Sequence, residues 1–379
     1  MANNNKHTGP NVPALRFPEF SGEWIESKLG DIADFSKGAG ISKDQRSEKG
    51  NPCILYGELY TRYKSEVITN VFSKTALPDS NLVKSKANDI IIPASGETAE
   101  DIATARCVPF DNILLGGDLN IIRLHEQDGK FFSYQLNGVR KYDIATVAQG
   151  VSVVHLHAGD LKGITVKYPS HIAEQEKISQ ILGLIDDRIA TQSKIIEEQE
   201  TLLKSLRDKL FNQWPDSFTQ CRIGDILNIG SGKDYQHLSN GDIPVYGTGG
   251  LMCYVNESLY EGESVCIGRK GTINKPMYLS GRFWTVDTLF YTHSFNGILP
   301  RFCYHLFCTI DWLTYNEASG VPSLSKSTIE KIQVSIPQID IQKRIVKILD
   351  SIEEKINTDS NILLDYQKQK AYLLSRMFI

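Results

Sequence analysis

The chain has 379 residues, of which 41% are hydrophobic and 23% charged, and its formal net charge is −4. This length allows two or three domains with proper cores, and the composition is that of a soluble globular protein. No apolar run reaches membrane length, and the mild net acidity excludes a uniformly basic nucleic-acid binder. Seven cysteines without a C-x-x-C pair predict reduced thiols in the cytoplasm.

Taken in order, the chain alternates between two globular regions and two long helices. Residues 1–10 are polar and predict a disordered tail. Two regions, 11–168 and 213–336, contain short apolar runs separated by Gly, Pro, Asn and Asp, which predict strands. These runs are 53–56, 89–92, 112–115 and 120–124 in the first region, and 243–246, 264–267 and 283–292 in the second. Residues 169–212 and 337–379 predict long helices.

The two helical segments are copies of each other. A shift of 167 positions matches Gln175 with Gln342 and Phe211 with Phe378. Apolar residues spaced alternately four and three apart form a heptad seam in both, with charge on the other faces. The seam positions are Ile178, Leu182, Ile185, Ile189, Ile196, Leu203, Leu206 and Leu210 in the first segment, and Ile345, Leu349, Ile352, Ile356, Leu363, Leu373 and Met377 in the second.

Such a stripe needs a partner, and each helix supplies one for the other, so we expect an antiparallel coiled coil. Polar residues interrupt the seam at Gln192, Gln199, Asp359 and Lys370. We interpret them as setting the register at some cost in stability. The alternative is two amphipathic helices that pack separately on the two globular regions.

The globular regions are also copies, with weaker similarity. Leu29-Gly30-Asp31-Ile32 matches Ile223-Gly224-Asp225-Ile226, Tyr56-Gly57 matches Tyr246-Gly247, and residues 92–98 align with 267–273. The predicted fold class is therefore α+β, a tandem duplication of a mixed α/β module followed by a long helix. The two helical segments are more similar to each other in sequence than the two globular regions are. This is expected if the helices form a common framework and each globular region recognises a different target.

The sequence offers no convincing catalytic motif. Gly230-Ser231-Gly232-Lys233 lacks the first glycine and the Ser/Thr of a phosphate-binding loop, so we interpret it as a turn. Asn51-Pro52-Cys53-Ile54 lacks the second proline and the aromatic residue of the adenine methyltransferase motif. His155 and His157 have no acidic or cysteine partner, and Cys303, His305 and Cys308 have poor spacing for one metal ion. We predict no catalytic residue and no metal site.

The loops carry polar side chains suited to DNA. Arg and Lys bind phosphates or guanine, Glu accepts from cytosine, and Asn pairs with adenine. The candidates are Lys37, Ser42, Lys43, Arg46, Tyr60, Arg62, Ser95, Glu97 and Thr98 in the first region, and Lys233, Tyr235, Tyr246, Thr248, Arg269, Lys270, Thr272 and Asn274 in the second. Solvated surface is the alternative interpretation of each.

As a whole, the chain resembles the specificity (S) subunit of a type I restriction-modification system. The resemblance covers nearly the whole chain. The motifs that carry it are Val12-Pro13-Ala14-Leu15-Arg16-Phe17-Pro18 with Trp24, the Leu/Ile-Gly-Asp-Ile that opens each region, Gly150-Val151 and Gly320-Val321 before the helices, and Glu174-Gln175-Glu176-Lys177-Ile178 with its counterpart Ile341-Gln342-Lys343-Arg344-Ile345.

The resemblance implies a non-catalytic, cytoplasmic subunit. Regions 11–168 and 213–336 would be target recognition domains, each reading one half of a split, asymmetric site in double-stranded DNA. Segments 169–212 and 337–379 would be the conserved spacer helices, on which two methyltransferase (M) subunits dock and restriction (R) subunits assemble. It implies no cofactor in this chain, with S-adenosylmethionine and ATP bound on partner subunits, and no membrane.

Two other functions fit parts of the sequence. A coiled-coil scaffold whose globular regions bind proteins would have the same helices. A salt-dependent mobility shift of one DNA sequence, seen only when the chain is bound to its partner subunit, would argue against it. A self-sufficient adenine methyltransferase would need the motifs that are missing here, and methyl transfer by the isolated chain would support it.

Overall fold

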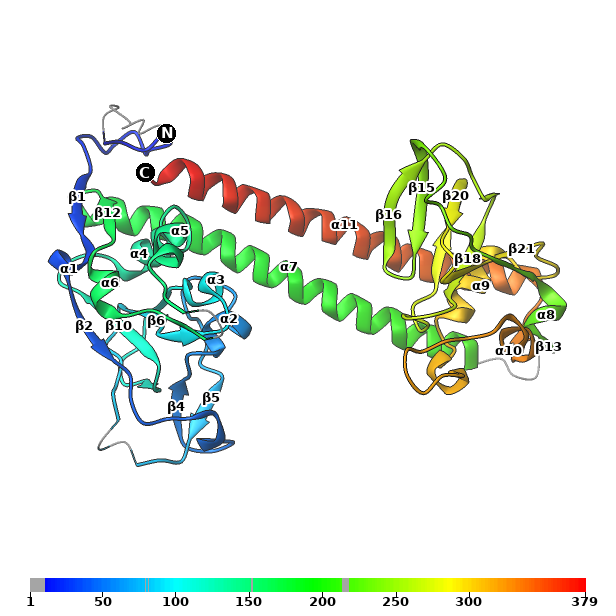
Figure 1. The fold of residues 1–379 in the computed structure, drawn as a ribbon, viewed down its shortest axis with the longest axis horizontal. Helices are drawn as coiled ribbons and strands as arrows, with labels where there is room; N and C mark the ends of the chain where they lie inside the picture. The colour runs from blue at the N-terminus through cyan, green and yellow to red at the C-terminus, as the bar shows by residue number, and fades with distance from the viewer. Residues whose placement is uncertain (1–10, 79, 81, 151–152, 213–217) are drawn as a thin grey trace. The chain divides into compact units, whose positions relative to one another are not determined.

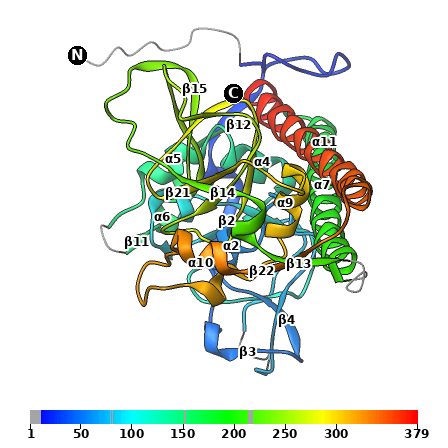
Figure 2. The ribbon, with the colours of Figure 1, turned by 90° about the vertical axis from the view of Figure 1, so that its right-hand side faces the viewer.

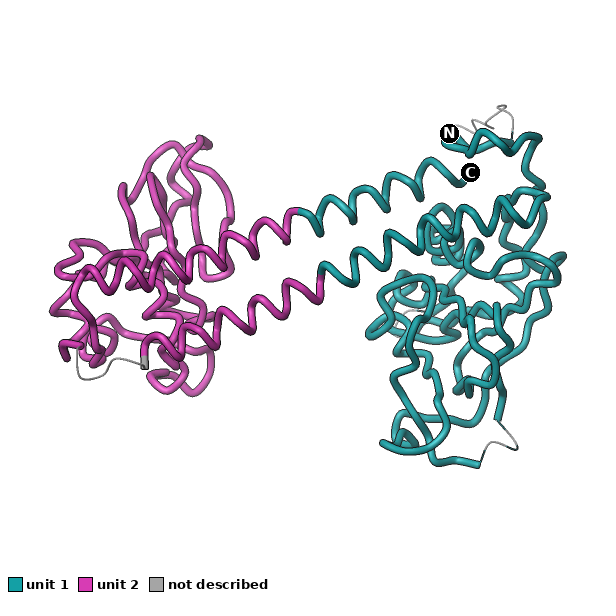
Figure 3. The backbone as a smooth tube through the Cα atoms, turned by 180° about the vertical axis from the view of Figure 1, so that it is seen from behind, with its two compact units in different colours: residues 1–192, 362–379 teal, residues 193–361 magenta. Residues whose placement is uncertain are grey.

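The computed structural model describes residues 11–78, 80, 82–150, 153–212 and 218–379 (Figure 1). The predicted tail 1–10, Val151 and residues 213–217, where the second globular region was predicted to begin, lie outside the described residues. The chain forms two compact units, residues 1–192 with 362–379 and residues 193–361 (Figure 3). Helices α7 (Ile172–Asn212) and α11 (Ile339–Met377) each contribute to both units.

Within each unit, α7 and α11 lie side by side and run antiparallel (Figures 1 and 2). In unit 1, Lys370 Nζ lies 2.6 Å from Asp186 Oδ1. In unit 2, Gln199 Nε2 donates to Asp359 Oδ2 at 2.8 Å. From Asp186 to Gln199 along α7, the partner in α11 changes from Lys370 back to Asp359. The predicted antiparallel pairing is therefore confirmed.

The predicted apolar seam residues are all buried or half-buried. The most deeply buried lie where the helices also pack on a globular core. Ile178 and Leu182 belong to the core of unit 1, together with Leu373 and Met377. Leu349 is fully buried in the core of unit 2. The half-buried Ile196 and Leu363 belong to neither of these core clusters, and a seam of two helices leaves part of each such side chain in water.

The globular part of unit 1 contains two four-stranded sheets. The first has the order β2-β10-β6-β8 and is antiparallel, and the second has the order β3-β5-β4-β9. The strands are β1 (Ile25–Lys28), β2 (Ala33–Lys37), β3 (Arg46–Ser47), β4 (Asn51–Ile54), β5 (Ser73–Thr75), β6 (Asp89–Pro93), β7 (Ser95–Gly96), β8 (Arg106–Val108), β9 (Leu114–Leu115), β10 (Leu119–Leu124), β11 (Val154–His155) and β12 (Thr165–Tyr168). The short helices are α1 (Leu29–Ile32), the 3-10 helix η1 (Lys43–Gln45), α2 (Glu58–Thr61), α3 (Ala99–Ile102), α4 (Gly129–Asn137), α5 (Lys141–Thr146) and α6 (Ala158–Lys162).

Unit 2 repeats this plan, with sheets of order β14-β21-β18-β19 and β16-β15-β20-β17. Its strands are β13 (Thr219–Arg222), β14 (Asn228–Ser231), β15 (Asn240–Gly247), β16 (Gly250–Val255), β17 (Tyr260–Glu261), β18 (Ser264–Gly268), β19 (Met277–Leu279), β20 (Arg282–Thr285), β21 (Leu289–His293) and β22 (Gln333–Ile336). Its short helices are α8 (Ile223–Ile226), α9 (Pro300–Phe307), the 3-10 helix η4 (Trp312–Tyr315) and α10 (Lys326–Lys331). The predicted fold class, a duplicated α+β module with a long helix after each copy, is confirmed.

The structure corrects two local predictions in unit 2. The run 283–292 is not one strand, because a turn closed by Leu289 N and Val286 O separates β20 from β21. The sequence 230–233 is not a turn, because Gly230 and Ser231 end β14, pairing with β21. Both corrections concern segments next to predicted DNA contacts.

The Gly-Asp pair that occurs near the start of each globular region has a role in local structure. Asp31 Oδ2 accepts from Lys28 N at 3.3 Å, and Asp225 Oδ2 accepts from Arg222 N at 2.9 Å, so each carboxylate caps its short helix. A Cβ on Gly30 would lie 2.8 Å from Lys162 Cβ, which leaves room only for glycine where α1 packs on α6.

Candidate nucleic-acid interface

Several predicted DNA contacts of unit 2 meet around residues 285–288, between β20 and β21. Lys233 N donates to Thr285 O at 2.9 Å, and Arg269 N donates to Thr288 O at 2.8 Å. The Tyr246 carbonyl accepts from Val286 N at 3.0 Å. Backbone hydrogen bonds therefore hold the end of β14, the end of β15 and the loop after β18 at one edge of the unit.

Gly271 brings the β15–β16 turn to the same edge. Its φ of +95° suits glycine, and a Cβ there would lie 3.6 Å from Thr248 Oγ1. Its N–H donates to Pro322 O at 2.8 Å. Thr248 is thus a close neighbour of the loop that contains the predicted contacts. Exposed side chains there are Lys233, Arg269, Lys270 and Asn274, and half-buried ones are Tyr235, Tyr246, Thr248 and Thr272.

Unit 1 has an equivalent edge. Gly38 N donates to Leu119 O at 3.0 Å and Ala94 N to Asp118 O at 2.7 Å, which places Lys37 and the segment 95–98 near the start of β10. A Cβ on Gly96 would lie 3.9 Å from the Tyr60 hydroxyl, so α2 reaches this edge as well. Burial raises the pKa of Tyr60, whose hydroxyl stays protonated and can donate.

An equivalent backbone hydrogen bond is present at both edges. Leu156 N donates to Ala94 O in unit 1, and Leu324 N donates to Arg269 O in unit 2, both at 2.9 Å. Ala94 and Arg269 are aligned in the repeat. The two edges are therefore built on one scaffold, and the side chains on them have diverged.

Some predicted contacts already have partners within the domain. Thr98 Oγ1 accepts from Asp101 N at 3.1 Å as the N-cap of α3. Ser95 is buried. The Arg62 guanidinium donates to Glu58 at 3.1 Å and lies 4.8 Å from the ring centre of Phe72. Ser42, Lys43 and Arg46 are exposed: Ser42 precedes η1, Lys43 is its first residue, and Arg46 begins the edge strand β3.

Exposed apolar residues that were not among the sequence-based candidates lie on the hairpin of unit 2. Leu251, Met252 and Tyr254 of β16 are 51%, 54% and 50% exposed. The sequence-based candidates were chosen for polar side chains, so these three residues were not among them. The Thr248-Gly249 turn could have indicated their exposure, because residues next to a hairpin turn are often accessible to solvent.

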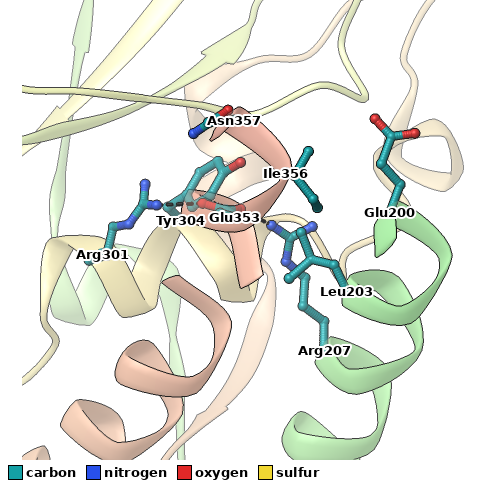
Figure 4. Close-up of a pocket in the computed structure, with 8 residues that line it drawn as sticks. All are labelled: Glu200, Leu203, Arg207, Arg301, Tyr304, Glu353, Ile356 and Asn357. Atoms are coloured by element: carbon teal, nitrogen blue, oxygen red, sulfur yellow. Dashed lines mark hydrogen bonds and ion pairs between the residues drawn. The ribbon is translucent and has the colours of Figure 1, made fainter. Parts of the chain in front are cut away.

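A cluster of charged side chains lies elsewhere in unit 2, beside a surface depression of about 420 Å³ (Figure 4). His305, Asp350 and Glu353 come close enough to suggest a metal site. However, Arg301 binds both Asp350 and Glu353, and Arg207 also binds Glu353. Figure 4 shows both guanidinium groups beside Glu353. The carboxylates are thus engaged by cations, and we assign the cluster to helix packing.

The nearby cysteines do not change this assignment. Burial raises the pKa of Cys303 well above its usual value and also raises that of Cys308. Both thiols therefore stay protonated near neutral pH, as expected for cysteines packed inside the domain.

Comparison with known proteins identifies the family. The family model described as the type I restriction modification DNA specificity domain matches residues 21–201 and again 215–365. The chain belongs to this family. It is a tandem pair of specificity domains, and the duplicated edges described above lie one in each.

Among type I specificity subunits of known sequence, the chain is 22% identical to the MjaIX subunit of Methanocaldococcus jannaschii over 297 residues, 65% of this chain and 67% of that protein. It is 23% identical to the EcoprrI subunit of Escherichia coli over 179 residues, 42% of this chain and 44% of that protein. A Haemophilus influenzae subunit matches at 28% over 30% of each chain. These last two matches span less than half of the relatives' length.

Solved structures share the fold over nearly the whole chain. The type I restriction-modification S subunit from M. genitalium has a TM-score of 0.70 at 20% identity and covers 97% of this chain and 99% of its own. A chain from a study of complex assembly and conformational transition in the type I system has a TM-score of 0.55 at 12% identity, with 94% and 97% covered. In the described part of the chain, none of the helices combines the length and hydrophobicity that crossing a membrane requires.

Proposed function

We propose that each recognition domain reads one half of a bipartite, asymmetric site in double-stranded DNA. The observation that supports this most directly is the pair of equivalent edges, which share their backbone hydrogen bonds and differ in their side chains. One scaffold with two sets of side chains suits two different half-sites. Exposed Lys233, Arg269 and Lys270 provide phosphate binding on one edge, and Lys37 does so on the other.

We further propose that α7 and α11 hold the methyltransferase subunits. Both helices expose apolar side chains outside the seam: Ile195, Leu202 and Ile348 in unit 2, and Leu184, Ile362 and Tyr372 in unit 1. Ile195 and Ile362 occupy the same position of the repeat, next to the seam. Apolar residues flanking a two-helix seam suit further helices that pack alongside it.

The chain itself does not transfer methyl groups in this proposal. S-adenosylmethionine would bind on the methyltransferase subunits and ATP on the restriction subunits, which join the same assembly. Methyl transfer by the purified chain alone, with S-adenosylmethionine supplied, would contradict this division of roles.

The test is to co-express the chain with the methyltransferase subunit of its own system and to map the methylated adenines in the genome. We expect one bipartite motif with a fixed unread spacer. Replacing residues 218–335 with the corresponding region of a relative should change one half of the motif only. A change in both halves, or a single undivided motif, would contradict the two-reader proposal.

A further inference from the structure

The β15–β16 hairpin carries apolar side chains that the core does not use. Leu251, Met252 and Tyr254 are each about half exposed, although β16 also supplies Cys253 and Val255 to a core cluster. β16 is an edge strand of its sheet, next to β15 (Figure 1). Neighbouring apolar side chains on an exposed hairpin indicate a surface that a partner covers.

The charges around this hairpin indicate which partner. Its turn, Thr248-Gly249, lies against Gly271, and the neighbouring residues Arg269 and Lys270 are exposed. Lys233 lies at the same edge through its hydrogen bond to Thr285. Near the turn, these three exposed cations outnumber the exposed acids Asp234 and Asp287, while the exposed acid of the hairpin itself, Asp242, lies at the far end of β15. Apolar side chains bordered by cations suit DNA, whose base edges are flanked by phosphates.

Comparison of the two domains shows that the hairpin occupies a variable position on a common scaffold. β15 pairs in parallel with β20, as β4 pairs in parallel with β9. The aligned dipeptides lie at the ends of these strands: Tyr56-Gly57 comes just after β4, and Tyr246-Gly247 forms the last two residues of β15. After the first dipeptide the chain forms helix α2, whereas after the second it turns back as β16. The two domains therefore present different elements at the same place.

We propose that the β15–β16 hairpin is the base-reading element of the second recognition domain. Leu251, Met252 and Tyr254 contact base edges in the major groove, including the C5-methyl group of thymine. Lys233, Arg269 and Lys270 bind the flanking phosphates. The major groove admits a two-stranded ribbon, and apolar side chains distinguish thymine by its methyl group. This inference rests on the proposed reading of DNA by the chain.

The test uses the complex with the methyltransferase subunit and a duplex that carries the motif found by methylation mapping. Binding is measured for the wild type and for a Leu251→Ser/Met252→Ser variant. Each complex is tested with thymine and with uracil, which lacks the methyl group, in each half-site separately. Leu313→Ser is the matched control, because Leu313 of η4 is 52% exposed in the same unit.

We expect the double variant to bind the thymine duplex about tenfold more weakly or worse, as for the loss of one good base contact. Uracil in one half-site should weaken the wild type and have little further effect on the variant. The other half-site should show no such difference, and Leu313→Ser should behave as the wild type.

The outcomes separate this inference from the proposed function. A wild-type complex without sequence-specific binding would refute the reading of DNA altogether. A specific wild-type complex, combined with a double variant of equal affinity and unchanged uracil sensitivity, would overturn the hairpin assignment alone. A double variant that no longer co-purifies with its partner would also overturn it, because the hairpin would then serve folding or assembly.

Discussion

Gln199 of α7 and Asp359 of α11 are hydrogen-bonded to each other across the seam, with 2.8 Å between Nε2 and Oδ2. Asp359 is only 4% exposed, and its other oxygen lies 2.9 Å from Lys355 Nζ. Both residues interrupt the heptad seam, and they meet. A buried carboxylate tolerates few alternative neighbours, so this pair favours one alignment of the two helices over shifted ones.

Replacing Gln199 by leucine should destabilise the chain by about 1–3 kcal/mol, because the buried Asp359 carboxylate loses its amide donor. The double variant Gln199→Leu/Asp359→Leu should recover most of this loss, since both polar groups are then absent. Urea unfolding of the three proteins provides the measurement. Glu197→Leu, at an exposed position of α7, is the control for adding a leucine. Equal stability of the single variant and the wild type would mean that this pair does not specify register.

Sequence periodicity was sufficient to predict the helices, their antiparallel pairing and the duplicated fold, because a heptad seam and a repeat are properties of the chain itself. It could not identify the partners of individual polar seam residues. Lys370 lies beside both Asp186 and Glu66, and Glu66 belongs to a loop of the first domain more than 300 positions away. Only tertiary packing brings that carboxylate to α11.

The candidate interface, too, could be predicted from the sequence only in part. The polar residues of the loops were predictable by type, but Thr98 and Arg62 turned out to have partners within their own domain. Leu251 and Met252 were not candidates because the candidates were chosen for polar side chains, and the exposure of an apolar residue is not visible in the sequence. The register shift between Val245 and Tyr246, which changes the pairing of β16, depends on the sheet and cannot be derived from residue pattern alone.

Acidification should destabilise unit 2 through His305. Burial is the main reason that the pKa of this imidazole is lowered from its ordinary value, although Asp350 and Glu353 oppose the shift and Arg207 adds to it. The folded state thus favours neutral His305, and the unfolded state takes up the proton first as the pH falls below about 6.5. Stability contributed by the neutral ring is therefore lost between about pH 7 and pH 5.

His305→Gln removes this contribution and introduces the residue that the first domain has at the aligned position, Gln135. The loss of thermal stability between pH 7 and pH 5 should be smaller in this variant than in the wild type. His237→Gln, at an exposed histidine of the same unit, is the control and should retain the wild-type pH dependence. An identical pH dependence of the wild type and His305→Gln would show that another group is responsible.

The exposed cations of the second edge should determine how salt affects DNA binding. If Lys270 binds a phosphate, Lys270→Gln in the methyltransferase complex should reduce the slope of log affinity against log salt by about 0.9. The weakening should be similar for cognate and unrelated duplexes, since phosphates carry no sequence information. Lys331→Gln, at an exposed lysine of α10, should leave the slope unchanged. A Lys270→Gln variant with the wild-type slope would remove this residue from the interface.

The helix pair should set the number of unread base pairs between the half-sites. Seven residues inserted after Gln192 in α7 and seven after Asn361 in α11 add one heptad to both helices, so the seam keeps its face. Both insertions fall between the Asp186–Lys370 contact and the Gln199–Asp359 contact, and each contact can therefore re-form.

The added rise is about 10.5 Å, which corresponds to at most about three base pairs of B-DNA. We expect methylation mapping to show both half-sites unchanged and the spacer lengthened by up to that number. Insertion in α7 alone is the matched control. The distance from Asp186 to Gln199 along α7 then exceeds the distance from Lys370 to Asp359 along α11, so the two contacts between the helices cannot both form. That variant should lose methylation or stability. A doubly extended variant that is fully active with the original spacer would show that the docked methyltransferase subunits, and not the helices, fix the distance between the readers.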